Sequence, residues 1–279
     1  MLRKKIYIDI TSFWNTEFMS GIQRVVREVT IRLLKMPELD IILFTWRNDE
    51  RDLTVLDNAD FPMCYDEGII KKNQIRKSGR LSLSDINAGD VFFDLDSTWD
   101  GRCHRRDEFV ANIVSRGVLY SSYVYDVIPI MHPEFWPCPN PPFYGYIAVN
   151  LRHADMLITS VNETVKRLSA LADKFGIPAP PCTVSWLGSD FKSNGVAGEI
   201  SKKAMEVVRD GRYILCVGTI EPRKNHKVVL DAYDEKIAAL GVNLVFAGRR
   251  GWLADDLLMR MDRHPKKGKG FFFLEGEND

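Results

Sequence analysis

Short apolar runs alternate along the chain with longer segments in which apolar residues recur at every third or fourth position. The runs predict β-strands at 5–10, 40–46, 90–96, the first part of 118–130, 156–159, 212–218, 242–248 and 270–276. The periodic segments predict helices at 22–36, 107–117, 141–155, 161–176, 224–241 and 252–264. Strands that alternate with helices build parallel sheets from βαβ units, so the pattern predicts an α/β protein.

A small, polar stretch at 189–199 predicts a linker between two such blocks. The blocks define an N-terminal domain, 1–190, and a C-terminal domain, 199–279, each Rossmann-like with a parallel sheet. The second has only three predicted strands, about half of a Rossmann unit, and is therefore expected to be incomplete. Ser160 and Glu163 have the spacing of a capping box, which predicts that a helix begins there.

The composition excludes several classes of protein. Of 279 residues, 45% are hydrophobic and 27% charged, as in a soluble globular protein, and 38 basic residues balance 38 acidic ones. The balance gives no electrostatic footprint for nucleic acid. The cysteines are odd in number and never spaced as CxxC, which argues against a disulfide scaffold or zinc site and fits a reducing compartment. The basic N-terminus has an apolar run broken by Asp9, so it predicts a first strand rather than a signal peptide, and the protein is expected to be cytoplasmic.

The stretch "GTIEPRKNHKVVLDAY", which starts at Gly218, directly follows a predicted strand. Ligands of open α/β sheets bind outside the carboxyl ends of the strands, where a glycine allows close approach and a helix N-terminus attracts anions. Arg223 can grip phosphate oxygens with a fork of N–H groups, and Lys224 adds a point charge. These features predict a diphosphate site. The alternative is a solvated turn with two surface cations, because neither a Walker loop nor GxGxxG is present.

A second turn strengthens the diphosphate interpretation. "VFAGRRGW" places a glycine and two arginines, Arg249 and Arg250, at the equivalent point of the next βα unit. We therefore expect two basic turns on one edge of one sheet.

The segments "VGTIEPRKNHKVVLDAY", "LVFAGRRGW" and "LEG" resemble the second domain of family 4 glycosyltransferases, which are retaining enzymes with the two-domain GT-B fold. "SGIQRVVREV", "YDVIPIMHPEFWP" and "HADMLITSVNETVKRL" resemble the first domain of the branch that builds bacterial surface polysaccharides. The resemblance covers nearly the whole chain. It implies a nucleotide diphosphate sugar as donor substrate, without a cofactor or an obligatory metal.

The resemblance also implies roles for individual residues. Lys224 and Arg223 would hold the donor diphosphate in a pocket lined by Gly218 and Thr219, although many members carry arginine at the position of Thr219. On the nucleobase side lie Glu275 and Gly276. Gly21, after the first strand, matches the glycine that faces the donor phosphates.

Two further residues have alternatives that the sequence leaves open. His132, in "IMHPEF", matches a histidine near the reacting sugar, or it is a loop histidine bonded locally. Asp126 orients sugar hydroxyls or caps its loop. The aromatic loop 132–146 suits stacking on a sugar acceptor or contact with a membrane surface, and core packing explains some of its rings equally well.

The implied reaction moves a hexosyl group, mannosyl or rhamnosyl, to a lipid-linked saccharide acceptor, with peripheral contact at the inner membrane surface. The chain stops at Asp279, before the pair of glutamates that family members carry, so we expect either a truncated or a degenerate member. Two alternatives remain: a non-catalytic partner subunit and a nucleotide-sugar epimerase of the same fold. Strand 270–276 is expected to leave a poorly covered sheet edge through which the protein self-associates.

Overall fold

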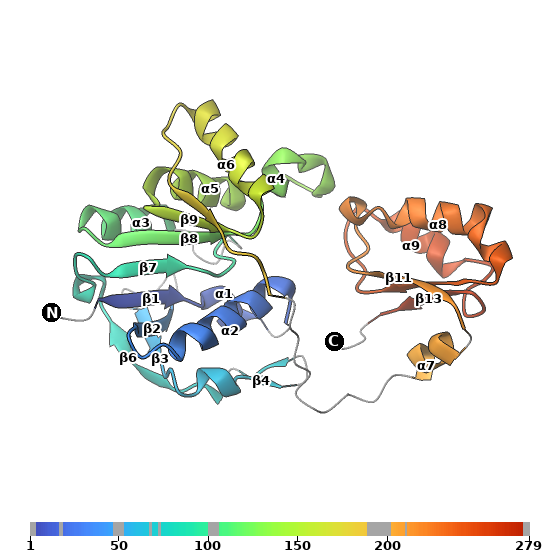
Figure 1. Ribbon diagram of the computed structural model, residues 1–279, viewed down its shortest axis with the longest axis horizontal. Coiled ribbons are helices and arrows are strands. Elements are labelled where there is room, and N and C mark those ends of the chain that lie inside the picture. Colours follow the sequence, from blue (N-terminus) through green and yellow to red (C-terminus); the bar gives the residue numbers. More distant parts are fainter. Residues whose placement is uncertain are drawn as a thin grey trace. The chain divides into compact units, whose positions relative to one another are not determined.

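The computed structural model describes residues 4–16, 19–46, 53–66, 69–71, 74–99, 106–188, 202–209 and 211–275. The chain divides into two compact units. Unit 1 comprises Met1–Met131 and Asn140–Ser189, and unit 2 comprises His132–Pro139 and Asp190–Asp279. Both are built from strands and helices in alternation, as the pattern predicts (Figure 1). The predicted linker at 189–199 lies outside the described residues.

The described part of unit 1 is organised around one mixed sheet with the strand order β10-β9-β8-β7-β1-β2-β3-β6. These strands are β1 (Lys5–Asp9), β2 (Asp40–Thr45), β3 (Leu53–Leu56), β6 (Lys77–Leu81), β7 (Val91–Asp94), β8 (Leu119–Val124), β9 (Met156–Thr159) and β10 (Cys182–Val184). From β2 through β1 to β10 the neighbours are parallel, whereas β3 and β6 are antiparallel additions. A separate two-stranded ribbon is formed by β4 (Tyr65–Asp66) and β5 (Ile69–Ile70). The sequence pattern predicts none of β3 to β6.

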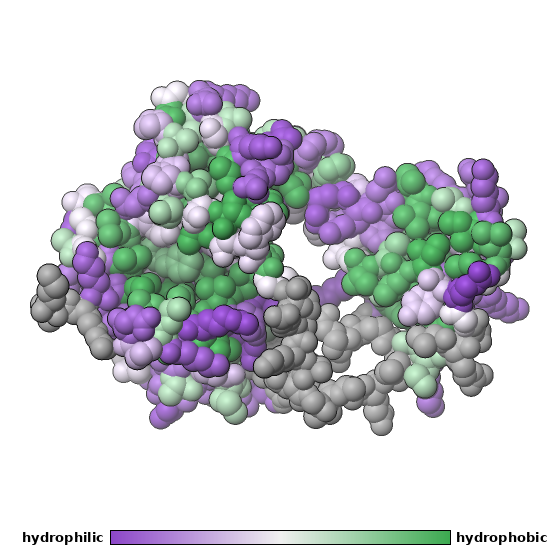
Figure 2. Space-filling view, viewed as in Figure 1, coloured by the Kyte–Doolittle hydropathy of each residue, from purple (hydrophilic) through white to green (hydrophobic). Residues whose placement is uncertain are grey.

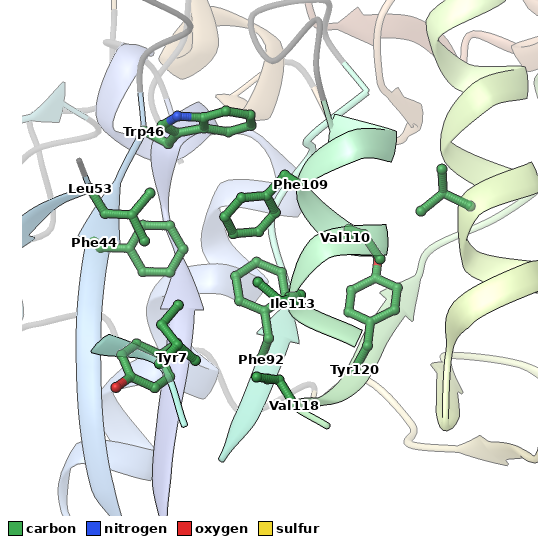
Figure 3. Packing of buried hydrophobic residues seen from close by; sticks show 12 residues of the cluster. Tyr7, Phe44, Trp46, Leu53, Phe92, Phe109, Val110, Ile113, Val118 and Tyr120 are labelled. Atoms are coloured by element: carbon green, nitrogen blue, oxygen red, sulfur yellow. The ribbon is translucent and has the colours of Figure 1, made fainter. Parts of the chain in front are cut away.

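Helices cover both faces of this sheet. Successive residues of a strand point to opposite faces, so neighbouring residues of one strand pack against different helices. They are α1 (Thr11–Asn15), α2 (Gly21–Leu34), α3 (Arg106–Ser115), α4 (Ile128–Met131), α5 (Pro141–His153) and α6 (Asn162–Phe175), with 3-10 turns at Phe61–Met63 and Leu83–Asp85. Tyr7 of β1 packs in one core cluster with Phe92 and with Phe109 of α3 (Figure 3). The next residue, Ile8, packs in a second cluster with Val26 of α2. The first strand is thus buried between two helical layers.

Two local features of unit 1 differ from the sequence pattern. The stretch after β1 contains the short helix α1, where no helix is predicted. The capping box at Ser160 and Glu163 does not form, because α6 begins at Asn162 with Val161 as its N-cap and no side-chain cap. Glu163 instead accepts a hydrogen bond of 2.7 Å from Arg167 one helical turn later.

Unit 2 contains a parallel sheet of β11 (Tyr213–Val217), β12 (Asn243–Ala247) and β13 (Phe271–Leu274) in its described part, in that order. The helices α8 (His226–Glu235) and α9 (Asp255–Asp262) lie on one face and α7 (Lys202–Arg209) lies on the other (Figure 1). Short 3-10 turns occur at Pro133–Phe135, Pro222–Lys224 and Ile237–Leu240. Each crossover follows the βαβ pattern that the sequence predicts.

As predicted, β13 is an edge strand, because it pairs with β12 on one side and with no described strand on the other. Self-association through this edge stays a prediction, and the two faces of the strand are well covered. All four side chains of β13 are buried, since α7 packs on one face of the strand and α8 and α9 pack on the other. The exposed apolar side chains of this sheet belong to β11, at the opposite edge. Among the helices that the structure describes, none is long and apolar enough to cross a membrane.

Candidate functional site

The two basic turns of unit 2 lie side by side. β11 and β12 are parallel neighbours, so the turns that follow them leave the same edge of the sheet. The backbone N–H of Ile220 donates to the carbonyl of Arg249 at 2.9 Å, and the N–H of Gly251 donates to the carbonyl of Ile220 at 3.1 Å. The predicted placement of two basic turns on one sheet edge is therefore confirmed.

Glycines permit this close approach of the two turns. Gly218 and Gly248 have φ angles of +146° and +159°, in the region that favours glycine. A Cβ atom added to Gly248 would lie 2.0 Å from the carbonyl oxygen of Gly218. A Cβ on Gly218 would instead lie 3.7 Å from Cε of Lys224. The stem of Lys224 thus extends back over Gly218, and both predicted residues share one location.

The structure separates the roles of the two predicted cations. Arg223 donates to the carboxylate of Glu221, a residue that is only 3% exposed. Lys224 is exposed and forms no ion pair with any residue in the described ranges. It lies directly before α8, where Asn225 adopts a left-handed conformation that asparagine tolerates and that turns the chain into the helix. Lys224 is therefore the cation of this turn that remains open to a ligand.

His226, the first residue of α8, lies beside Lys224 and is not predicted from the sequence. Its ring is 3% exposed and packs edge-on against Phe246, with ring centroids 4.8 Å apart. Within the described chain, Nδ1 has no hydrogen-bond partner. Burial, and secondarily the charge of Lys224, lowers the pKa of His226. The imidazole is thus neutral at pH 7 and leaves Lys224 as the charge at this point.

The second turn uses one of its cations internally. Arg250 donates to both carboxylate oxygens of Asp262, at 2.8 and 2.9 Å, and to Glu275 at 3.2 Å. Its guanidinium also lies over the ring of Phe273. These hydrogen bonds hold the pKa of Asp262 well below its usual range. Glu275, predicted on the nucleobase side, is thus tied to this turn, while Gly276 lies outside the described residues.

The predicted residues at the strand ends of unit 1 are placed as follows. Gly21 is the first residue of α2, and an added Cβ would meet no atom within 4 Å. The side chain of its N-cap, Ser20, makes no capping hydrogen bond, so this helix terminus is open. Asp126 accepts a hydrogen bond of 2.9 Å from the N–H of Ile128 and caps the start of α4. A role of Asp126 toward a sugar stays a prediction.

His132 makes local contacts within unit 2. Its Nδ1 lies 3.1 Å from a carboxylate oxygen of Glu134, and its ring stacks on Phe135 with centroids 5.5 Å apart. Its side chain is 51% exposed. These contacts match the alternative of a loop histidine bonded locally, and a role near a reacting sugar stays a prediction.

Some rings of the aromatic loop serve packing. Trp136 stacks on Trp252, which follows the second basic turn, with centroids 5.1 Å apart. The indole N–H of Trp252 donates to the carbonyl of Phe135 at 2.7 Å. These rings belong to unit 2, so the packing alternative holds for Trp136.

Sequence reasoning missed a buried charge cluster at the switch point of unit 1, where the sheet continues from β1 to β2 on one side and to β7 on the other. Asp9 ends β1, Asp94 ends β7, and both carboxylates lie 2.6 Å from the guanidinium of Arg106, the first residue of α3. A fully buried neighbour, Asp96, accepts backbone hydrogen bonds from Phe13 at 2.6 Å and from Ser97 at 2.7 Å. Burial raises the pKa of Asp96 to about 7. An aspartate directly follows each of two apolar runs, Asp9 in "YID" and Asp94 in "FFD", and this is the sequence signal that could have revealed the cluster.

A hollow of about 660 Å³ opens between the N-terminal ends of α8 and α9. Its lining includes Pro222, His226, Asp255 and Asp256, but not Gly218, Thr219 or Lys224. Carboxylates and cations both line the hollow, because Glu221, Lys227 and Arg260 also contribute to it. Since Gly218, Thr219 and Lys224 are not part of the lining, the hollow does not coincide with the predicted diphosphate site. The described residues contain no group of three or more His, Cys, Asp or Glu side chains that could hold a metal ion.

No protein-family model matches the chain. Curated relatives are serotype-specific mannosyltransferases named WbdA from Escherichia coli. One is 28% identical over 294 residues, which cover 99% of this chain and 34% of the relative. A second is 28% identical over 297 residues with the same shares. The chain thus spans about a third of the length of these curated relatives.

Solved structures share the fold. The pneumococcal O-GlcNAc transferase GtfA, in complex with UDP and GlcNAc, is similar with a TM-score of 0.55 and 10% identity over 99% of this chain and 77% of that chain. Anabaena Alr3699/HepE, in complex with UDP and glucose, is similar with a TM-score of 0.51 and 11% identity over 98% of this chain and 70% of that chain. The fold is that of the GT-B glycosyltransferases, as the sequence predicts.

Proposed function

We propose that this protein is a glycosyltransferase that moves a hexosyl group from a nucleotide diphosphate sugar to a saccharide acceptor in polysaccharide biosynthesis. Three independent lines support the proposal: relatives named mannosyltransferases, a fold shared with transferases solved with UDP and a sugar, and the basic turns of unit 2. The observation that carries it is the position of Lys224, an exposed cation without an ion pair in the described structure, over Gly218 at the carboxyl end of β11.

In the proposed site, Lys224 contacts the donor diphosphate over Gly218 and Thr219. The chain turns at Asn225 and enters α8, whose N-cap side chain makes no capping hydrogen bond. The N–H of Val228 donates to the carbonyl of Asn225, so the N–H groups of His226 and Lys227 are the ones proposed to meet phosphate oxygens. Burial and the charge of Lys224 lower the pKa of His226, so Lys224 rather than His226 supplies the positive charge of this turn. The leaving diphosphate gathers negative charge as the glycosidic bond breaks, and the placed cation and helix terminus stabilise that charge. Arg223 supports the turn through Glu221 and binds phosphate less directly.

The finer features of the proposed reaction rest on the relatives and on the family resemblance. Mannosyl transfer agrees with the relatives' names, and retention of configuration agrees with family 4. Gly21, at the N-terminus of α2, is the proposed second contact of the donor phosphates, because a Cβ atom added there would meet no atom of the described residues within 4 Å. The proposed acceptor is a lipid-linked saccharide reached at the inner membrane surface, with His132 and Asp126 near the transferred sugar. No cofactor or obligatory metal is part of the proposal.

The test is calorimetric titration of GDP, UDP and dTDP into the protein and into Lys224→Ala at one fixed salt concentration. A charge-assisted hydrogen bond contributes about 1.5 to 3 kcal/mol, so the variant should bind the preferred diphosphate about ten to a hundred times more weakly. The bare nucleoside should lose much less affinity. Arg223→Ala should weaken binding by a smaller factor.

Lys227→Ala is the matched control, since Lys227 lies on the first turn of α8 but forms an ion pair of 2.7 Å with Asp231. It should bind like the parent. Equal affinity in Lys224→Ala and the parent would remove the diphosphate site and, with it, the basis of the proposed function. The sugar is then identified by thermal shift with a panel of nucleotide sugars, because binding to the folded state raises the apparent stability.

A further inference from the structure

Two histidines of unit 2 are buried, and the structure gives them different partners. Figure 2 shows hydrophobic residues in the middle of the visible face of unit 2 and hydrophilic residues mostly around them. His226 and His264 lie within the unit instead, with exposed fractions of 3% and 6%. Nε2 of His264 lies 2.7 Å from a carboxylate oxygen of Asp234, and its Nδ1 accepts the N–H of Lys266 at 3.2 Å.

His226 lacks such partners at one of its ring nitrogens. Within the described chain, its Nδ1 is buried and has no hydrogen-bond partner. Leaving a buried polar atom unpaired costs free energy, and native structures keep few such atoms. The unpaired nitrogen of His226 therefore requires a physical explanation.

The surroundings of His226 oppose a positive charge on its ring while no anion is bound. The ring packs edge-on against Phe246, and burial removes the water that would solvate an imidazolium. Lys224, two residues earlier, adds a like charge, and burial together with this charge lowers the pKa of His226. His226 is also the first residue of α8, where the helix dipole disfavours a cation.

The other charged side chains near His226 line the hollow between α8 and α9. They are Glu221, Lys227, Asp255, Asp256 and Arg260. Glu221 pairs with Arg223, Lys227 pairs with Asp231, and Arg260 pairs with Asp231 and Asp234. Asp255 and Asp256 occupy the first turn of α9. The charge that lowers the pKa of His226 is that of Lys224, the same cation that contacts the diphosphate in the proposed site.

We propose that His226 takes up a proton when a diphosphate binds at Lys224, so that the occupied site holds two cations instead of one. This inference rests on the proposed function, because it needs a diphosphate beside Lys224. The negative charge of the diphosphate cancels the repulsion that Lys224 exerts on an imidazolium. The proton comes from the buffer and binds to the ring nitrogen that carries the lone pair, and no bond of the protein breaks.

The sign of the pH dependence follows from linkage. The diphosphate raises the pKa of His226 above its value in the free chain, and protonation tightens diphosphate binding by the same factor. Affinity is therefore highest at low pH, falls as pH rises through the pKa of His226 in the complex, and is constant above it.

The first test is calorimetric titration of GDP-mannose and UDP-glucose, whose diphosphate groups do not titrate between pH 5 and 8. The affinity of the parent for the tighter of the two should be about three to ten times greater at pH 5 than at pH 8. At pH 6 the binding enthalpy should differ between MES and bis-Tris buffers, because each proton that the protein takes up is released by the buffer.

Two variants of His226 isolate its contribution. His226→Phe keeps an aromatic ring against Phe246 but cannot titrate, so its affinity should be nearly independent of pH and its binding enthalpy nearly independent of the buffer. His226→Gln gives the same comparison with a polar side chain, and circular dichroism checks that both variants fold. His153→Gln is the control, since His153 lies at the end of α5 in unit 1 and its variant should keep the pH dependence of the parent.

The second test observes the imidazole directly by NMR of the chain with ¹³C-labelled histidine. The ring signal of His226, assigned by its loss in His226→Phe, should titrate at higher pH when the nucleotide sugar is bound, and the signal of His264 should not respond. Binding that depends on Lys224 but has the same pH dependence in the parent and in His226→Phe would overturn this inference and leave the proposed function intact. A parent that binds neither nucleotide sugar would overturn both.

Discussion

The two units place charge at the ends of parallel strands in opposite ways. In unit 1, Asp9 and Asp94 are buried at the switch point and share the guanidinium of Arg106. In unit 2, the strand-end cations are exposed, and Lys224 lies over a glycine without an ion pair in the described structure. A buried, mutually paired set holds loops in place, whereas an exposed cation beside a glycine is available to a ligand. Position at a strand end alone therefore does not identify a binding site.

The largest expected effect comes from breaking the buried set. Arg106→Ala leaves Asp9 and Asp94 without their cation in a buried site, which costs about 3 to 5 kcal/mol of unfolding free energy. Urea unfolding followed by circular dichroism measures the loss. Arg32→Ala is the control, because Arg32 pairs with Glu28 at the surface and should change stability little. A loss in Arg106→Ala no larger than in the control would show that the cluster is not an electrostatic unit.

A second prediction uses pH to test the burial of Asp96. Burial raises the pKa of Asp96 to about 7 from an ordinary value of 3.8, so between these pH values the folded chain keeps a proton that the unfolded chain loses. The contribution of Asp96 to stability is therefore full below about pH 4 and falls as pH rises to 7, by about 1.4 kcal/mol per pH unit at most.

The measurement is the unfolding free energy of the parent and of Asp96→Asn from pH 4 to 8. Asn cannot titrate, so the difference between the two proteins should change across this window and level off above it. The variant also loses one acceptor, because Phe13 and Ser97 donate to different oxygens of Asp96 and Asn has only one oxygen. A difference in unfolding free energy that is independent of pH would show that Asp96 does not titrate between pH 4 and 8 in the folded chain.

A third prediction concerns Gly248, whose lack of a side chain lets the two basic turns pack against each other. Gly248→Ala places a Cβ against the carbonyl of Gly218 and requires a positive φ, so it should destabilise unit 2 by about 1 to 3 kcal/mol. Differential scanning calorimetry of the parent and variant measures the effect. An unchanged melting temperature would mean that the two turns separate freely.

The smallest expected effect is at Gly21. Gly21→Ala adds a methyl group to open space at the start of α2, so stability should stay within about 0.5 kcal/mol of the parent. Affinity for a nucleoside diphosphate should fall nonetheless if the donor approaches this backbone closely. Parent-like stability with parent-like affinity would remove Gly21 from the proposed site and leave Lys224 as its principal contact.

Several elements of the fold follow from short-range pattern. Helix α2 and strands β2, β12 and β13 lie within a few residues of their predicted bounds, because apolar periodicity is a local property. The antiparallel strands β3 and β6 and the short helix α1 were not predicted from the pattern. Their segments carry no clear period, and their conformations depend on the pairing with β2 and on the hydrogen bond from Phe13 to Asp96.

By itself the sequence determined the α/β class, the GT-B resemblance and the order of the two basic turns, because each depends on neighbours along the chain. Only the tertiary structure decided which charges at the strand ends are paired. Arg223 and Arg250 lie in the predicted basic turns and find carboxylate partners, and Glu275, in the last predicted strand, pairs with Arg250, whereas Lys224 finds no partner among the described residues. The burial of Asp9, Asp94 and Asp96 and the exposure of β11 rather than β13 were decided in the same way. Pairing and burial are set by segments brought together from distant positions, and no pattern of adjacent residues records them.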